Sequence, residues 1–265
     1  MPGFFSPAVY PGGNAPGLAV SQAVVYCRPI LRVHCMSYLL VLDASSSLCS
    51  VALGDEKHQW HLTEHQPRRH AQRLLPMVDD ILTQAGIARS ELSGIAYGCG
   101  PGSFTGIRIA ASVMQGIAMA LNIPVAGVSS LQAIAQAVFK QTDAQQVMAV
   151  MDAHMGEVFW AIYQRQSDLC CLSGNERVGS PAECLVQMQN FSGVVAGDGL
   201  TLPDFSHVSQ QWADIQPQAD IMLQLARPLW LNGAFGTAEE HPPVYLRDSV
   251  AWKKLDEQPS LLKRH

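Results

Sequence analysis

An aspartate followed by hydroxyl side chains is the first group of residues in this chain that could carry out chemistry. Asp43 ends the apolar run 39–42, and Ser45, Ser46 and Ser47 follow it. An acid at the carboxyl end of a buried strand, beside hydroxyl groups, suits the binding of phosphate and Mg²⁺. An aspartate that only accepts hydrogen bonds from the amides of its own turn gives the same pattern. The sequence leaves both interpretations open.

A glycine-rich stretch at 98–106 is the second candidate. It holds four glycines between a predicted strand and a predicted helix, and Arg108 follows in the first turn of that helix. Backbone amides exposed by such a loop can bind an anion. No Lys follows the glycines, so the Walker pattern is absent, and glycines also serve tight packing alone. The candidate phosphate or nucleotide residues are Asp43, Ser45, Gly100, Pro101, Gly102, Ser103, Phe104, Thr105, Gly106 and Arg108.

The helix predicted at 106–121 is apolar on every side, because its plainly polar side chains are limited to Arg108, Ser112 and Gln115. A helix that is hydrophobic all round is buried all round. One face can cover a sheet, so the other needs a partner protein or a second domain of this chain. The second face comprises Ile109, Val113, Gly116, Met119 and Ala120, and the preceding helix is expected to add Leu74, Met77 and Ile81 to the patch.

Hydrophobic patterning places these candidates on an α/β fold. From Met36 the chain predicts three antiparallel strands, a helix, a strand, a helix, a strand and a helix. That order is typical of an RNase H-like domain, a three-layer α/β unit. The second half begins again with strands but is less regular, which predicts a second, degenerate copy. The expected parts are an extension at 1–35 outside the fold, an N-terminal lobe at 36–140, a C-terminal lobe at 141–254 and a tail at 255–265.

Composition narrows the classes of function. The chain has 265 residues, 48% of them hydrophobic and 15% charged, which is typical of a globular protein. Its net charge of −5 argues against a stand-alone nucleic-acid binder, since Lys and Arg dominate phosphate binding. The sequence has no run of 18 apolar residues, so we predict no membrane-spanning helix. Seven cysteines without a Cys-x-x-Cys motif predict free thiols, no zinc site and a cytoplasmic location. The histidines are expected to be solvated, so no metal site is predicted.

The stretch 100–108, Gly-Pro-Gly-Ser-Phe-Thr-Gly-Ile-Arg, resembles the signature of the TsaB (YeaZ) family. Further blocks with the same resemblance follow in order along the chain. They lie at 42–46, 50–53, 70–77, 127–131, 152–158 and 243–247, so the resemblance extends from Met36 to about Lys254.

This resemblance implies an actin-like ATPase (ASKHA) fold of two RNase H-like lobes. It also implies a role in making threonylcarbamoyladenosine, the modified adenosine beside the anticodon in tRNAs that read codons starting with A. In this family the subunit is usually not the catalyst. It binds its paralogue TsaD, which transfers the threonylcarbamoyl group, and TsaE, an ATPase, joins them; tRNA is contacted only indirectly. The implied interface residues are His70, Arg73, Leu74, Met77, Ile81, Ile109, Ser112, Val113, Gly116 and Ala120, and the same helices would form a homodimer without TsaD.

Departures from the relatives of this family bear on activity. The His-rich metal motif of TsaD has no counterpart, because Ser129 and Ser130 stand at the equivalent place. The Gly-Gly adenosine motif of actin-like kinases is reduced to Gly197-Asp198-Gly199. We therefore expect a non-catalytic subunit with no required cofactor, although ATP or ADP with Mg²⁺ could bind at the junction with the partner. The alternatives are an active kinase or ATPase that uses Asp43 for Mg²⁺, and a glycopeptidase-like hydrolase, for which Ser103 has no evident base.

Overall fold

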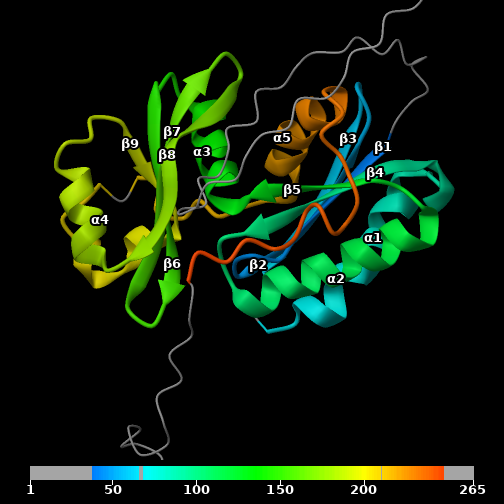
Figure 1. Ribbon diagram of the computed structural model, residues 1–265, viewed down its shortest axis with the longest axis horizontal. Coiled ribbons are helices and arrows are strands. Elements are labelled where there is room, and N and C mark those ends of the chain that lie inside the picture. Colours follow the sequence, from blue (N-terminus) through cyan, green and yellow to red (C-terminus); the bar gives the residue numbers. More distant parts are fainter. Residues whose placement is uncertain (1–37, 66–67, 210, 248–265) are drawn as a thin grey trace, which may run out of the picture. The chain divides into compact units, whose positions relative to one another are not determined.

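The computed structural model describes residues 38–65, 68–209 and 211–247 (Figure 1). The predicted extension at 1–35 and tail at 255–265 lie outside the described residues. Within the described part, two β-sheets have the strand orders β3-β2-β1-β4-β5 and β8-β7-β6-β9. Both sheets belong to the same compact unit of the chain.

The elements of the first sheet follow one another along the chain as the sequence predicts, three strands, a helix, a strand, a helix, a strand and a helix. Strands β1 (Tyr38–Asp43), β2 (Leu48–Gly54) and β3 (Gln59–His65) form an antiparallel meander, and β4 (Leu92–Gly100) and β5 (Val125–Ser129) lie parallel to β1. Central β1 is apolar along its length because helices cover both of its faces. Edge strand β3 alternates between exposed and half-buried residues, as an edge strand with one solvated face should.

Four helices cover the first sheet, two on each face. Helices α1 (His70–Ala85) and α2 (Phe104–Leu121) pack on the face that presents Leu40 and Leu42. Helices α3 (Ser130–Gln141) and α5 (Ala219–Leu231) pack on the face that presents Leu39 and Val41. Successive residues of β1 therefore serve two different hydrophobic cores, which follows from the alternation of side chains along a strand.

The second sheet repeats the order and strand directions of the first and lacks its fifth strand. Strands β6 (Gln146–His154), β7 (Glu157–Gln166) and β8 (Leu169–Gly179) are antiparallel neighbours, and the short β9 (Val194–Ala196) lies parallel to β6. Helix α4 (Pro181–Met188) lies between β8 and β9 in the chain, as α1 lies between β3 and β4. This topology agrees with a degenerate second copy; its origin by duplication stays a prediction.

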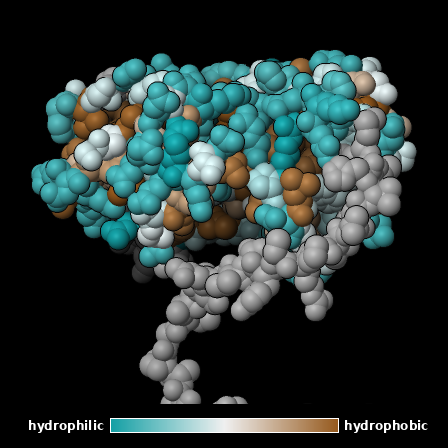
Figure 2. All heavy atoms as spheres, turned by 90° about the horizontal axis from the view of Figure 1, so that it is seen from above, coloured by the Kyte–Doolittle hydropathy of each residue, from teal (hydrophilic) through white to brown (hydrophobic). Residues whose placement is uncertain are grey.

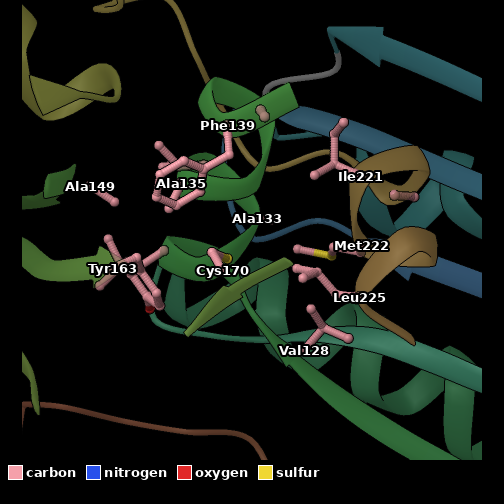
Figure 3. Packing of buried hydrophobic residues seen from close by; sticks show 14 of the residues in the cluster. Val128, Ala133, Ala135, Phe139, Ala149, Tyr163, Cys170, Ile221, Met222 and Leu225 are labelled. Carbon is pink, nitrogen blue, oxygen red and sulfur yellow. The ribbon is translucent and has the colours of Figure 1, made fainter. Parts of the chain in front are cut away.

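Helices α3 and α5 form a layer that both sheets share (Figure 3). Ala133 and Phe139 of α3 pack in one hydrophobic cluster with Ala149 of β6 and with Met222 of α5 (Figure 3). Val128 of β5 belongs to the same cluster. Helix α5 follows the second sheet in sequence but packs against β1 and β2 of the first. The chain therefore returns to the first sheet after completing the second.

Candidate functional site

The outer face of α2 is an apolar surface within the described residues. Ser103 caps the helix by accepting a hydrogen bond from the amide of Gly106 at 3.2 Å, and Asn122 ends it in the left-handed conformation. The inner face packs on the sheet through Ile107, Ala110, Ala111, Met114 and Ala118. On the outer face Ile109 and Val113 are half-buried, Ser112, Gly116 and Ala120 are exposed, and Met119 is 85% exposed.

Helix α2 is also long and apolar enough to span a membrane, at 18 residues and mean hydropathy 1.4. This finding differs from the sequence expectation, which required an uninterrupted apolar run. Arg108 and Gln115 interrupt the run but leave the mean high. The inner face of α2 contacts β4 and α1, and the core helix of a globular protein meets the same criterion. The apolar surplus of α2 therefore lies on its outer face.

Helix α1 differs from the sequence expectation. Leu74, Met77 and Ile81 have no exposed surface, because they face β2 and fill the core under α1 and α2. The structure places these three side chains inside the protein rather than in an apolar patch. Leu75, which is 49% exposed, is the large apolar side chain that α1 turns outward. The outer apolar surface, which we call the α2 surface, is thus made by Leu75, Ile109, Val113, Gly116, Met119 and Ala120.

The polar residues expected at this interface are held by neighbours within the chain. The expectation that the histidines are solvated is wrong for His70, which is buried at the start of α1 with its Nε2 3.2 Å from the carbonyl oxygen of Leu48, and burial lowers the pKa of His70. Arg73 donates to both carboxylate oxygens of Glu64, at 2.9 and 2.5 Å, and to Asp80 at 3.3 Å. These contacts order the base of α1 beside the α2 surface.

The glycine-rich loop packs against the turn between β1 and β2. The amide of Ser103 donates to the carbonyl oxygen of Ser45 at 2.8 Å. A Cβ atom on Gly102 would overlap that same carbonyl oxygen, and one on Gly106 would overlap the carbonyl oxygen of Ala44. These glycines are therefore required by close approach of two backbone segments, which is the alternative that the sequence left open.

Residues 241–247, which we call the strap, cover the same loop from another side. A Cβ atom on Gly100 would lie 2.7 Å from the carbonyl oxygen of Val244. The guanidinium of Arg108 lies 3.7 Å from the centre of the Phe104 ring, and its Nε donates to the Tyr245 hydroxyl at 3.0 Å. Pro101 is buried after a cis peptide bond, and Thr105 is exposed. Arg108 thus contacts two aromatic rings, those of Phe104 and Tyr245.

Asp43 is fully buried beneath this loop. Its Oδ1 accepts the amide of Ser45 at 3.3 Å, and its Oδ2 has no hydrogen-bond partner among the described residues. Burial raises the pKa of Asp43 to about 7, and hydrogen bonds from Ser45 offset only part of this rise. The nearby hydroxyl of Ser47 donates to Gln216 at 2.9 Å, and that of Ser46 accepts the amide of Leu48.

These residues do not fit a nucleotide held in the loop with Mg²⁺ on Asp43. Phosphate binding needs free backbone amides and room beside bare glycines. Here the amides of Ser103 and Gly106 are already hydrogen-bonded, and backbone carbonyls fill the space beside Gly100, Gly102 and Gly106. The carboxylate that would bind Mg²⁺ has no exposed surface.

The start of α3 carries a different polar cluster from the metal motif of TsaD. Ser129 caps α3, and its hydroxyl is hydrogen-bonded to the carboxylate of Glu176. The hydroxyl of Tyr163 donates to the same Glu176 oxygen at 2.7 Å, and burial raises the pKa of Glu176. In the described part of the chain, no three His, Cys, Asp or Glu side chains are grouped so that they could hold a metal ion.

Sequence reasoning missed the role of the strap. The family resemblance at 243–247 includes Tyr245 and Arg247, but it predicts no contact partner for either residue. Their partners Arg108 and Glu157 lie 137 and 90 positions away in the sequence. No local spacing connects such residues; the available signal was an aromatic residue and an arginine after Pro242 and Pro243.

Comparison with known proteins agrees with this architecture. The family model described as TsaD, tRNA N6-adenosine threonylcarbamoyltransferase, matches residues 63–228. The two sheets and this match define a protein of the actin-like class built from RNase H-like lobes.

Similar individual proteins narrow the class further. A protein of Escherichia coli K12 named tRNA threonylcarbamoyladenosine biosynthesis protein TsaB is 40% identical over 225 residues, which are 82% of this chain and 97% of that protein. Its namesake from Haemophilus influenzae is 37% identical, over 82% and 96% of the two chains. The structure of YeaZ from Pseudomonas aeruginosa superposes with a TM-score of 0.72 at 41% identity, covering 79% of this chain and all of that one. The chain belongs to the TsaB (YeaZ) family.

Proposed function

We propose that this chain is a non-catalytic subunit in the formation of N6-threonylcarbamoyladenosine beside the anticodon of tRNA. The names of its relatives support the pathway. The observation that carries the subunit role is the α2 surface, an apolar helix face that the described residues leave uncovered. A face of this kind marks a protein-binding site.

The proposed partner on this surface is TsaD, and TsaE joins the pair. Gly116 and Ala120 are exposed and small, so another helix can approach the α2 backbone closely. Met119 supplies a large flexible apolar side chain that can adapt to a partner. Without TsaD, a second copy of this chain would cover the same surface by a two-fold contact. The negative net charge supports indirect rather than direct contact with tRNA.

The chain is proposed to need no cofactor of its own and to work in the cytoplasm. The glycine-rich loop is filled by its own backbone, so ATP or ADP with Mg²⁺ would bind at the junction with the partner instead. The same observation argues against an independent kinase or ATPase activity. Asp43, which has no exposed surface, argues against it too.

The test is size-exclusion chromatography with light scattering of the chain mixed with TsaD, with and without ATP and Mg²⁺. We expect a complex of one copy of each protein. Val113→Asp and Gly116→Glu place a charge on the α2 surface and should abolish that complex. A Cβ on Gly116 meets no atom within 4 Å, so that variant should fold normally.

Val186→Asp is the matched control, because Val186 is 63% exposed on α4, away from α2. It should bind TsaD as the unchanged chain does. Stoichiometric co-purification of both α2 variants with TsaD would show that the interface is elsewhere. A monomer at high concentration without TsaD would contradict the proposed homodimer. Turnover of ATP by this chain alone would instead support the kinase alternative and make Asp43 the first residue to replace.

A further inference from the structure

The strap is fixed to the first sheet at the carboxyl end of β4. The hydroxyl of Tyr97 donates to the carbonyl oxygen of His241 at 2.9 Å, and the amide of Val244 donates to the carbonyl oxygen of Cys99 at 2.8 Å. Tyr97 itself is fully buried, so this anchor belongs to the core. In Figure 1 the orange-to-red chain runs from the first sheet towards β6.

The middle of the strap holds the start of α2. The Phe104 and Tyr245 rings lie 5.3 Å apart, and Arg108 contacts both of them. The backbone of Val244 lies directly against the bare backbone of Gly100. The glycine-rich loop is therefore enclosed by the β1–β2 turn on one side and by the strap on the other.

The far end of the strap reaches the hairpin between β6 and β7. The guanidinium of Arg247 is hydrogen-bonded to the carboxylate of Glu157 and to the carbonyl oxygens of Ala153 and His154, the last two at 3.3 and 3.5 Å. His154 and Met155 both adopt left-handed backbone conformations, with φ of 58° and 57°. Such conformations are unfavourable for residues other than glycine. The Arg247 guanidinium stabilises this turn because it donates hydrogen bonds to the carbonyl oxygens of Ala153 and His154.

We propose that the strap links the glycine-rich loop to the β6–β7 hairpin, and that Arg247 is the residue that holds the end of the strap against this hairpin. Removal of the Arg247 contacts frees the strap from the second sheet and lets Val244 separate from Cys99. The strap then no longer links the second sheet to the N-terminus of α2, and the two sheets remain joined through the shared layer of α3 and α5. This device depends on contacts within the chain and is independent of TsaD binding.

Hydrogen exchange of the full chain, measured residue by residue by NMR without TsaD, tests the proposal. Arg247→Ala should accelerate exchange of the Val244 amide about tenfold or more, since hydrogen bonds to charged groups are the strong ones. Amides of the 152–158 hairpin should exchange faster as well, while those of α1 should not change. Glu157→Gln, which keeps the side-chain shape, should act in the same direction with a smaller effect.

Arg89→Ala is the matched control, because Arg89 makes an exposed ion pair with Asp79 outside the strap. It should leave the Val244 amide unchanged. Unchanged Val244 exchange in both Arg247→Ala and Glu157→Gln would overturn the proposal, since the contacts with Tyr97, Cys99 and Arg108 would then hold the strap without Arg247. Equal acceleration across α1 and the strap would overturn it too, because Arg247 would then act on global stability.

Discussion

At the carboxyl ends of its strands each sheet has an aspartate and neighbouring glycines, but the helix or turn that follows these residues differs between the two sheets. In the first sheet Asp43 ends β1 beside the loop 98–106; in the second, Asp198 follows β9 between Gly197 and Gly199. A Cβ on Gly197 would overlap the carbonyl oxygen of Val150, so its bare backbone also serves close packing. The first loop leads into the long apolar α2, while the second leads into a short 3₁₀ turn, Asp198–Thr201. In the described residues, the glycine-containing loop therefore leads into a long apolar helix in the first sheet and into a single short turn in the second.

The two acids also differ in their neighbours. Among the described residues no basic side chain is hydrogen-bonded to Asp43, whereas Asp198 accepts the amide of Asp152 at 3.3 Å, and the Asp152 carboxylate lies 3.0 Å from Nδ1 of His154. Burial raises the pKa of Asp43 to about 7 and that of Asp198 to about 6. Asp43 is fully buried and Asp198 is half-buried, and parallel substitutions in the two regions test whether these acids serve the structure.

Glycine replacement should give the largest effect. Gly106→Ala forces a Cβ onto the Ala44 carbonyl and should destabilise the protein by roughly 3 kcal/mol or more. Gly197→Ala should cost a similar amount, because its φ of 121° and its contact with Val150 both oppose a side chain. Urea denaturation measures both, with Gly116→Ala as the control. That change should stabilise exposed α2 by about 1 kcal/mol; a mild Gly106→Ala would break the close-packing account.

Replacement of the acids should give the next effect, and it should depend on pH. A raised native pKa means that the unfolded Asp43 ionises first, so stability falls as pH rises from about 4 to about 7. The loss amounts to about 4 kcal/mol at most for Asp43, and to about 3 kcal/mol for Asp198 over pH 4 to 6. Asp43→Asn and Asp198→Asn should each flatten the stability curve in their own window. A difference in stability between wild type and each Asn variant that does not fall with rising pH through its window would contradict the assignment for that residue.

Helix caps should give a smaller and equal effect in the two regions. Ser103 caps α2, and Ser180 caps α4 by accepting the amide of Glu183 at 3.3 Å. Ser103→Ala and Ser180→Ala should each cost about 1 kcal/mol in thermal or urea unfolding. A much larger cost for Ser103→Ala would sharpen the difference, because it would show that the cap also holds the loop against Ser45.

The exposed ion pair between Arg89 and Asp79 should contribute least, although its N–O distance is 2.6 Å. Arg89→Ala should change unfolding by less than about 1 kcal/mol, since solvent screens such pairs. Urea unfolding at low and high salt measures it. A larger loss would mean that α1 depends on its exposed charges as well as on its buried face.

Much of the fold followed from local patterns. The helix predicted after the three antiparallel strands is α1 at His70–Ala85, and the predicted succession of strands and helices along the first half of the chain is observed. The α2 faces were assigned correctly because helical periodicity separates Ile107 from Val113. Periodicity places Leu74 and Ile81 on one stripe of α1 but cannot say whether that stripe meets a sheet or solvent, so their burial was not predicted.

The loop and the strap show a different limit. Four glycines between a strand and a helix predict free amides as readily as close packing. Which of the two occurs depends on the backbone of Ala44 and Ser45, more than 50 positions earlier, and of Val244, more than 100 positions later. Contacts of that kind have no local signature. These contacts exist only in the folded protein, where the sheet brings the distant segments together.

The shared layer of α3 and α5 has a consequence for how the chain emerges during synthesis. Strands β1 to β5 are complete in sequence by residue 129, but α5, which covers one of their faces, is not finished until residue 231. A ribosome that adds about 5–20 residues per second leaves that face without its helix for several seconds or more. During this interval Leu39 and Val41 lack the cover that α5 gives them in the folded protein. The hydrophobic core on this face of the first sheet is therefore completed only after the second sheet has been synthesised.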